Sequence, residues 1–234
     1  MMKLNLIFAV AVVTFSSRSV YAQTVPPVPP MTNGGALENN GMKHLNVALS
    51  DTALSVHVSD PPASPVIMTS GMGVDYTDDK FNVLENVYFN GQYGWLPEGT
   101  FDALPADSAV WIKRTGATTP AGAEFRVYEG GNMREGMAAW TMNEIYANDG
   151  DIWMWDGAMQ HDYYTADLPG DYRMSFEVFV GDQSGTPLTQ FSPAAASLDF
   201  RVVPEPTSYG WFGLIATAML LRNQRRRCER SPRS

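Results

Sequence analysis

The chain has 234 residues, 44% of them hydrophobic, and a formal net charge of −9 at pH 7. Residues 23–203 hold 8 Lys and Arg against 23 Asp and Glu, a net charge near −15 that argues against a nucleic-acid partner. The chain has one cysteine, Cys228, in an arginine-rich C-terminal tail, so an intramolecular disulfide is excluded. The length allows one domain with a core large enough to need neither disulfides nor metals.

The first 22 residues have the features of a secretory signal peptide. Lys3 gives a positive start, residues 4–15 form an apolar run, and Val20-Tyr21-Ala22 resembles a small-x-small cleavage site. The run is shorter than the roughly 20 apolar residues of a membrane-spanning helix. We therefore expect export and a mature chain that begins at Gln23, with a buried N-terminal strand as the alternative.

The next segment changes from linker composition to strand patterning. Residues 23–42 are rich in Pro, Gly and Asn and have no periodic apolar face, so we expect a flexible linker. Residues 43–203 form the predicted domain, which opens with HLNVALS and ALSVHVS on either side of Ser50-Asp51-Thr52. Two alternating segments around a polar turn predict a β-hairpin, which would pair Leu49 with Leu54.

Short alternating segments continue to the end of this domain. They are residues 81–89, 109–114, 124–129, 171–180 and 197–203. The last two predict inward side chains at Tyr172, Met174, Phe176, Val178, Val180, Leu198, Phe200 and Val202. Such strands, separated by Gly, Pro and Asp loops, predict an all-β fold, an antiparallel β-sandwich of Ig-like or Greek-key type.

One turn strengthens this prediction. Leu168-Pro169-Gly170-Asp171-Tyr172 resembles the tyrosine corner of Greek-key sandwiches, in which the phenol bonds back across the turn. An ordinary turn followed by a strand tyrosine is the alternative.

The C-terminal end combines three features in order. Pro204-Glu205-Pro206 precedes a 13-residue apolar run at 209–221. As a helix this run would be about 20 Å long, short of a ~30 Å hydrocarbon core. Near this run, positive charges lie only on its C-terminal side, and this asymmetry predicts a cytoplasmic tail. The tail arginines are Arg222, Arg225, Arg226, Arg227, Arg230 and Arg233.

This end, residues 204–234, resembles the PEP-CTERM sorting signal of Gram-negative bacteria. The resemblance implies an exosortase-type membrane protease as partner, transient association with the inner membrane, removal of the tail, and delivery to the cell surface or extracellular matrix. An ordinary single-span anchor is the alternative. The stretches QYGWLPEGTF, WMWDGAMQHDYY and YRMSFEVFVGD are also similar to PEP-CTERM proteins of planctomycete-type bacteria, whose exported domains have no assigned activity.

No motif in the chain points to catalysis. GxSxG, HExxH, a phosphate-binding glycine loop and a Cys-His pair are all absent from the sequence. We therefore expect that the protein is not an enzyme and has a structural or interaction role. A carbohydrate- or metal-binding surface module is the second hypothesis, and a secreted hydrolase is the third.

We expect no cofactor, apart from two candidate sites for weakly bound zinc or calcium. His44 and His57 would be diagonal neighbours, about 7–8 Å apart, on the solvent face of the hairpin. If the loop that contains His161 folds over that sheet, the three histidines could form a zinc site with one open coordination position. A calcium site is suggested by three closely spaced carboxylates, Asp75, Asp78 and Asp79, although their spacing is not that of an EF-hand. Solvated side chains and a polar loop are the favoured alternatives.

A dense aromatic stretch, DIWMWDGAMQHDYY, is the last candidate site. Trp153, Trp155, Tyr163 and Tyr164 would either stack against an extracellular polysaccharide or close the end of the core, and core closure is favoured. Alternation in IWMW places both tryptophans on one face of an extended segment.

Overall fold

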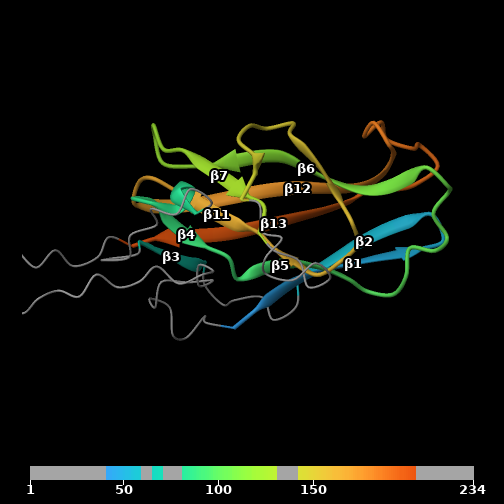
Figure 1. Cartoon of the computed structure of the whole chain (residues 1–234), viewed down its shortest axis with the longest axis horizontal. Coiled ribbons are helices and arrows are strands. Elements are labelled where there is room, and N and C mark those ends of the chain that lie inside the picture. The colour runs from blue at the N-terminus through green and yellow to red at the C-terminus, as the bar shows by residue number, and fades with distance from the viewer. Residues whose placement is uncertain (1–40, 59–64, 71–80, 131–141, 204–234) are drawn as a thin grey trace, which may run out of the picture.

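The computed structural model describes residues 41–58, 65–70, 81–130 and 142–203. This part of the chain is nearly all β, with a single 3-10 turn, η2 (Asn82–Leu84), and no helix long and apolar enough to cross a membrane (Figure 1). The strands are β1 (Lys43–Ser50), β2 (Ala53–Val58), β3 (Val66–Ser70), β4 (Tyr88–Asn90), β5 (Tyr93–Pro97), β6 (Ser108–Thr118), β7 (Phe125–Tyr128), β8 (Glu144–Tyr146), β9 (Ile152–Trp155), β10 (Gln160–His161), β11 (Tyr163–Ala166), β12 (Gly170–Asp182) and β13 (Ala194–Val202).

Several predictions from the sequence fall outside these residues. They concern the signal peptide at 1–22, most of the 23–42 linker, the loop with Asp75, Asp78 and Asp79, and the sorting signal at 204–234.

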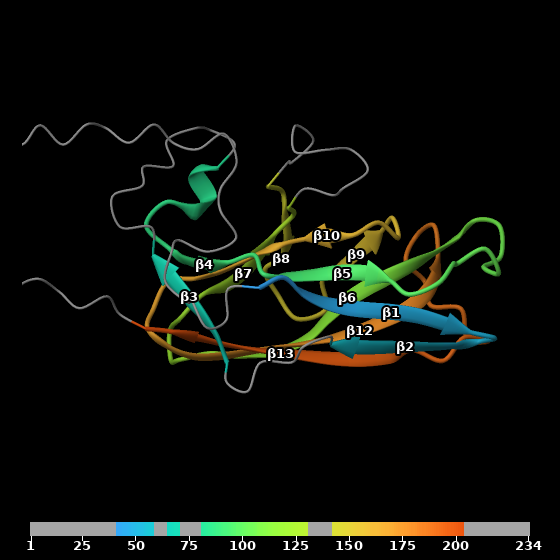
Figure 2. The ribbon, with the colours of Figure 1, turned by 90° about the horizontal axis from the view of Figure 1, so that it is seen from below.

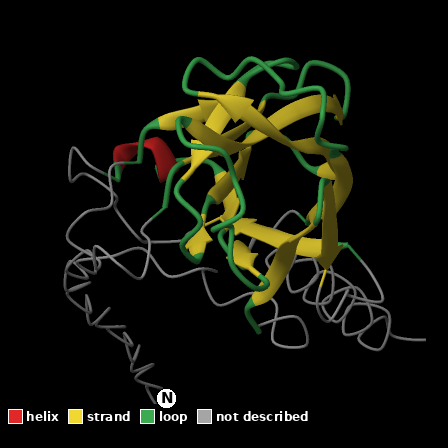
Figure 3. Cartoon of the chain, turned by 90° about the vertical axis from the view of Figure 1, so that its right-hand side faces the viewer, coloured by secondary structure: helices red, strands yellow, loops and turns green. Residues whose placement is uncertain are grey.

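The strands form two sheets around a shared core. One sheet has the order β10-β5-β1-β2, and Figure 2 shows β5, β1 and β2 side by side. The other has the order β8-β7-β11-β4-β3-β13-β12-β6-β9. Trp95 of the first sheet packs edge-on against Phe176 of the second, with ring centroids 5.6 Å apart. The predicted all-β, sandwich-like character is therefore confirmed, and Figure 3 shows the strands arranged around the interior.

The predicted alternation on β12 and β13 is also confirmed. Tyr172, Met174 and Phe176 are buried, as are Leu198 and Phe200. The intervening side chains lie on the solvent face; there Arg173 pairs with Asp199 at 2.6 Å, and Arg201 pairs with Asp171.

The prediction of purely antiparallel sheets is wrong at two places. β1 pairs with β5 in parallel, and β13 pairs with β3 in parallel. An alternating sequence specifies which side chains face the core, but a strand of either direction satisfies that pattern. The direction of the neighbour is set by the connections, so the sheets are mixed.

The predicted strand at 81–89 is shorter than its pattern. Phe81 precedes the η2 turn and Leu84 ends it; both are buried, and their three-residue spacing brings them to one side of a 3-10 turn. Asn86 has φ 59°, a left-handed conformation that interrupts an extended segment. Only Tyr88–Asn90 forms a strand.

The tyrosine corner is confirmed. The Tyr172 hydroxyl donates a hydrogen bond to the Leu168 carbonyl oxygen at 2.5 Å, across the Pro-Gly turn. Gly170 in this turn has φ 142°, a conformation that favours glycine. The bond fixes the entry of the chain into β12, which lies beside β13 and β6.

Candidate binding sites

Three of the four candidate aromatic side chains are buried in the core. Trp155, Tyr163 and Tyr164 are each 2% exposed or less, and Trp153 is half-buried. Tyr164 packs on Phe200 with centroids 4.9 Å apart. Trp153 and Trp155 occupy the more buried face of β9, whereas Ile152 and Met154 are exposed. Of the four, Trp155 also forms the wall of a pocket.

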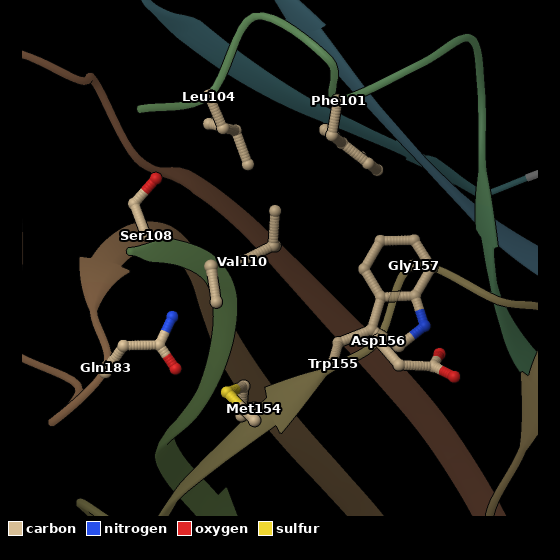
Figure 4. A pocket seen from close by; sticks show the side chains of 10 residues that line it. Phe101, Leu104, Ser108, Val110, Met154, Trp155, Asp156, Gly157 and Gln183 are labelled. Carbon is tan, nitrogen blue, oxygen red and sulfur yellow. The ribbon is translucent and has the colours of Figure 1, made fainter. Parts of the chain in front are cut away.

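This pocket has a volume of about 310 Å³ and lies where β9 meets the segment that follows β5 (Figure 4). Phe101 packs edge-on against Trp155 at 5.7 Å between ring centroids, while Ser108, Asp156 and Gln183 add polar atoms. Ligand pockets typically have volumes of roughly 300–1,000 Å³ and mainly apolar walls with a few polar groups. The lining residues are Phe101, Leu104, Ser108, Ala109, Val110, Met154, Trp155, Asp156, Gly157 and Gln183.

The Trp155 wall is held in place by local hydrogen bonds. Its Nε1 donates to the Ala158 carbonyl oxygen at 2.7 Å, and the Ala158 backbone N–H donates to Asp156 Oδ1 at 2.7 Å. The indole is therefore fixed before any ligand enters, which lowers the ordering cost of binding.

The hairpin register places the predicted histidines. Leu49 pairs with Leu54 and Asn46 with His57, as the sequence predicted. His57 lies on the edge strand β2 and is exposed, but His44 is half-buried. The expectation that both are solvated is therefore wrong for His44, because His161 on β10 contacts it, with ring centroids 5.5 Å apart and planes inclined at 70°.

Gly94 allows the two histidines to meet. In the sheet order β10-β5-β1, His161 is opposite Gly94, and Gly94 is opposite His44. A Cβ atom on residue 94 would lie 2.6 Å from His161 Nε2, so only glycine leaves room for the ring above β5. The structure thus brings together two of the three candidate histidines, across an intervening glycine.

The environment of His161 favours a neutral ring. The side chain is 5% exposed, and its Nδ1 lies 3.0 Å from the Gly91 carbonyl oxygen, which fixes the proton on Nδ1 in the neutral tautomer. Burial lowers the pKa of His161, and the neighbouring His44 lowers it further. Its Nε2 is buried and has no hydrogen-bond partner among the described residues. Within the described part of the chain, no hydrogen-bond donor therefore uses the lone pair of this atom.

The next residue, Asp162, is a buried carboxyl group in the core. Its Oδ1 accepts hydrogen bonds from Gln160 Nε2 at 2.9 Å and from the Gly130 backbone N–H at 3.3 Å, but its Oδ2 has no partner among the residues described. Burial raises its pKa to about 7 despite these bonds. The Trp95 indole opposes this rise, although its Nε1 forms no hydrogen bond of normal geometry.

Sequence reasoning missed Asp162, Gln160 and Gly94. The glycine had a readable signal, because a glycine inside a strand pattern often marks the close approach of another group. Asp162 had none, since the adjacent QHDYY letters resemble a polar loop. Within the described ranges, no group of three or more His, Cys, Asp or Glu side chains is placed to hold a metal ion.

No protein-family model matches the chain, and no curated protein matches it. Among the solved structures that match, one described as the N-terminal domain of PorA is 11% identical, with 67% of this chain and 95% of that chain covered. Its TM-score is 0.30, too low for the likeness to support an argument about fold or function.

Proposed function

We propose that the chain is an exported protein that an exosortase-type protease trims and releases to the cell surface or extracellular matrix, where it has a structural or interaction role. The observation that carries this proposal is the position of the tripartite signal. β13 ends at Val202 and Pro204-Glu205-Pro206 follows at once. Removal of residues 204–234 would therefore leave every described strand intact.

The acidic body agrees with an extracellular location. Residues 23–203 carry a net charge near −15, which favours solubility and repels nucleic acid. We further assign the body to the Greek-key, Ig-like class of sandwich, with the tyrosine corner at Tyr172 as the supporting feature.

Intact mass spectrometry of the surface-exposed protein tests this function. We expect a mass that lacks both residues 1–22 and the arginine tail. Glu205→Ala should leave uncleaved chain at the inner membrane, whereas Glu229→Ala, which removes an acid outside the motif, should be processed normally. Recovery of surface protein that still carries Arg225–Arg227 would contradict the proposal.

A carbohydrate-binding role is the second candidate, and the pocket beside Trp155 is the observation that favours it. The apolar faces of sugars stack on aromatic rings such as the half-buried Phe101, and Ser108, Asp156 and Gln183 would bond to hydroxyl groups. The pocket is open to solvent along Met154, which is 47% exposed.

Two neighbouring positions on β9 give a matched test. Met154 lines the pocket, whereas Ile152, 39% exposed, lies on the same face of the strand outside it. On a glycan array, Met154→Ala should weaken binding to any captured polysaccharide and Ile152→Ala should not. Absence of binding, or equal loss in both variants, would reject the pocket as a sugar site.

A further inference from the structure

The outer face of the four-stranded sheet carries two imidazoles that face each other over a glycine. His161 reaches across Gly94 toward His44, and the ring centroids lie 5.5 Å apart. Two imidazoles that bind one tetrahedral ion, at Zn–N distances of about 2.0–2.1 Å, would have centroids about 5 Å apart. The present separation is close to that of a bound pair.

The hydrogen bonding of His161 is that of a metal ligand. Metal-binding histidines usually donate one ring N–H to a carbonyl or carboxylate and bind the ion through the other nitrogen. His161 Nδ1 lies 3.0 Å from the Gly91 carbonyl oxygen, and Nε2 is buried with no hydrogen-bond partner in the ranges that the structure describes. An unused buried acceptor costs free energy unless something binds it.

A third donor atom lies on the same face. Asn46 follows His44 by two residues on β1, so its side chain projects to the same side of the sheet. Its Oδ1 is buried and also lacks a hydrogen-bond partner in the described part of the chain. The face therefore carries the Nε2 atom of His161, the ring of His44 and, on the same side of β1, a carbonyl oxygen, and His57 is not needed.

We propose that His44 and His161 bind one divalent transition-metal ion of the Zn²⁺ or Cu²⁺ class above Gly94. Imidazole suits both ions, and Cu²⁺ is expected to bind more tightly by the Irving–Williams order. Two protein nitrogens leave coordination positions for further ligands, and Asn46 Oδ1 projects from the same face of the sheet. The ion would link β10 to β1 across β5.

Isothermal titration calorimetry of the full chain, freed of metal by chelation, tests the site. Cys228, a thiol outside the described residues, is replaced by serine in every sample so that it cannot bind the ion. Zinc chloride and copper sulfate are titrated separately. We expect one ion per chain, and a loss in affinity of at least about 10-fold for His44→Gln and for His161→Gln, since even supporting residues of metal sites contribute that much.

His57→Gln is the matched control and should bind the ion as the parent does. Gly94→Ala should weaken binding without removing either ligand, because the added Cβ would lie 2.6 Å from His161 Nε2. Circular dichroism establishes whether each variant is folded. If His161→Gln, whose side chain is more buried, does not fold, the affinity of His44→Gln provides the test. Electron paramagnetic resonance of the copper form should show two imidazole nitrogens.

Failure of both ions to bind, or equal affinity in the parent and His44→Gln, would overturn the proposal. A loss with His57→Gln as large as that with His44→Gln would also overturn it, because the ion would then lie elsewhere on the hairpin.

Discussion

The clearest prediction concerns the pH dependence of stability that Asp162 imposes. Burial raises the pKa of this carboxyl from 3.8 to about 7 in the folded chain. Between these values the folded state holds a proton that the unfolded state releases. Stability therefore falls as the pH rises from about 4 to about 7, and the full penalty persists at higher pH.

The magnitude follows from the size of the shift. Each pKa unit corresponds to about 1.36 kcal/mol, so ionisation of Asp162 costs at most about 4 kcal/mol above pH 7. From pH 5 to pH 8 the cost is about 3 kcal/mol, because the first part of the penalty is already present at pH 5. Asp162→Asn can still accept the bonds from Gln160 and Gly130 and cannot ionise. The free energy of unfolding of Asp162→Asn should therefore exceed that of the parent by a margin that grows by about 3 kcal/mol from pH 5 to pH 8.

Urea unfolding followed by tryptophan fluorescence measures the margin. The relevant quantity is the difference in free energy of unfolding between the parent and Asp162→Asn at each pH. The lowered pKa of His161 adds a pH dependence of opposite sign to both proteins, and this contribution cancels in the difference. Asp102→Asn removes an exposed carboxyl and serves as the control. A margin for Asp162→Asn that stays constant from pH 5 to pH 8 would refute the buried, protonated carboxyl.

Two further predictions concern packing. Tyr172→Phe removes the hydrogen bond to the Leu168 carbonyl and should lower the free energy of unfolding by about 0.5–1.5 kcal/mol; an unchanged urea midpoint would show that the corner contributes nothing. Trp155→Ala should cost about 3–5 kcal/mol because the indole is buried, and Trp153→Ala should cost less because that ring is half-buried. If both tryptophan variants melt like the parent, neither ring supports the core.

The parts of the fold that were predictable are those in which a local pattern decides the structure. The register of β1 and β2 follows from their apolar alternation and the intervening turn, and the bond of Tyr172 follows from the corner sequence. The parallel neighbours of β1 and β13 were not predictable, because alternation contains no information about strand direction. At Phe81 and Leu84, a period-two pattern concealed a three-residue spacing.

The candidate sites were predictable only in part, for a related reason. The sequence identified His44, His57 and His161, but the selection of two of them depends on the pairing of β10 with β5 at Gly94. Two strands of two and five residues meet there, far apart in the chain. The burial of Asp162 depends likewise on the crossing of the chain from β10 to β11, between the two sheets.

The place of β13 within its sheet constrains when the domain can fold. This strand lies between β3 and β12, with five strands on one side of it and three on the other. Its partner β3 begins at Val66, so their pairing at Phe200 closes a loop that contains most of the domain. Contacts so distant in sequence form slowly and late. If the chain is exported as proposed above, β3 and β4 would stay apart from β12 until β13 emerged, and the polypeptide would remain open for translocation.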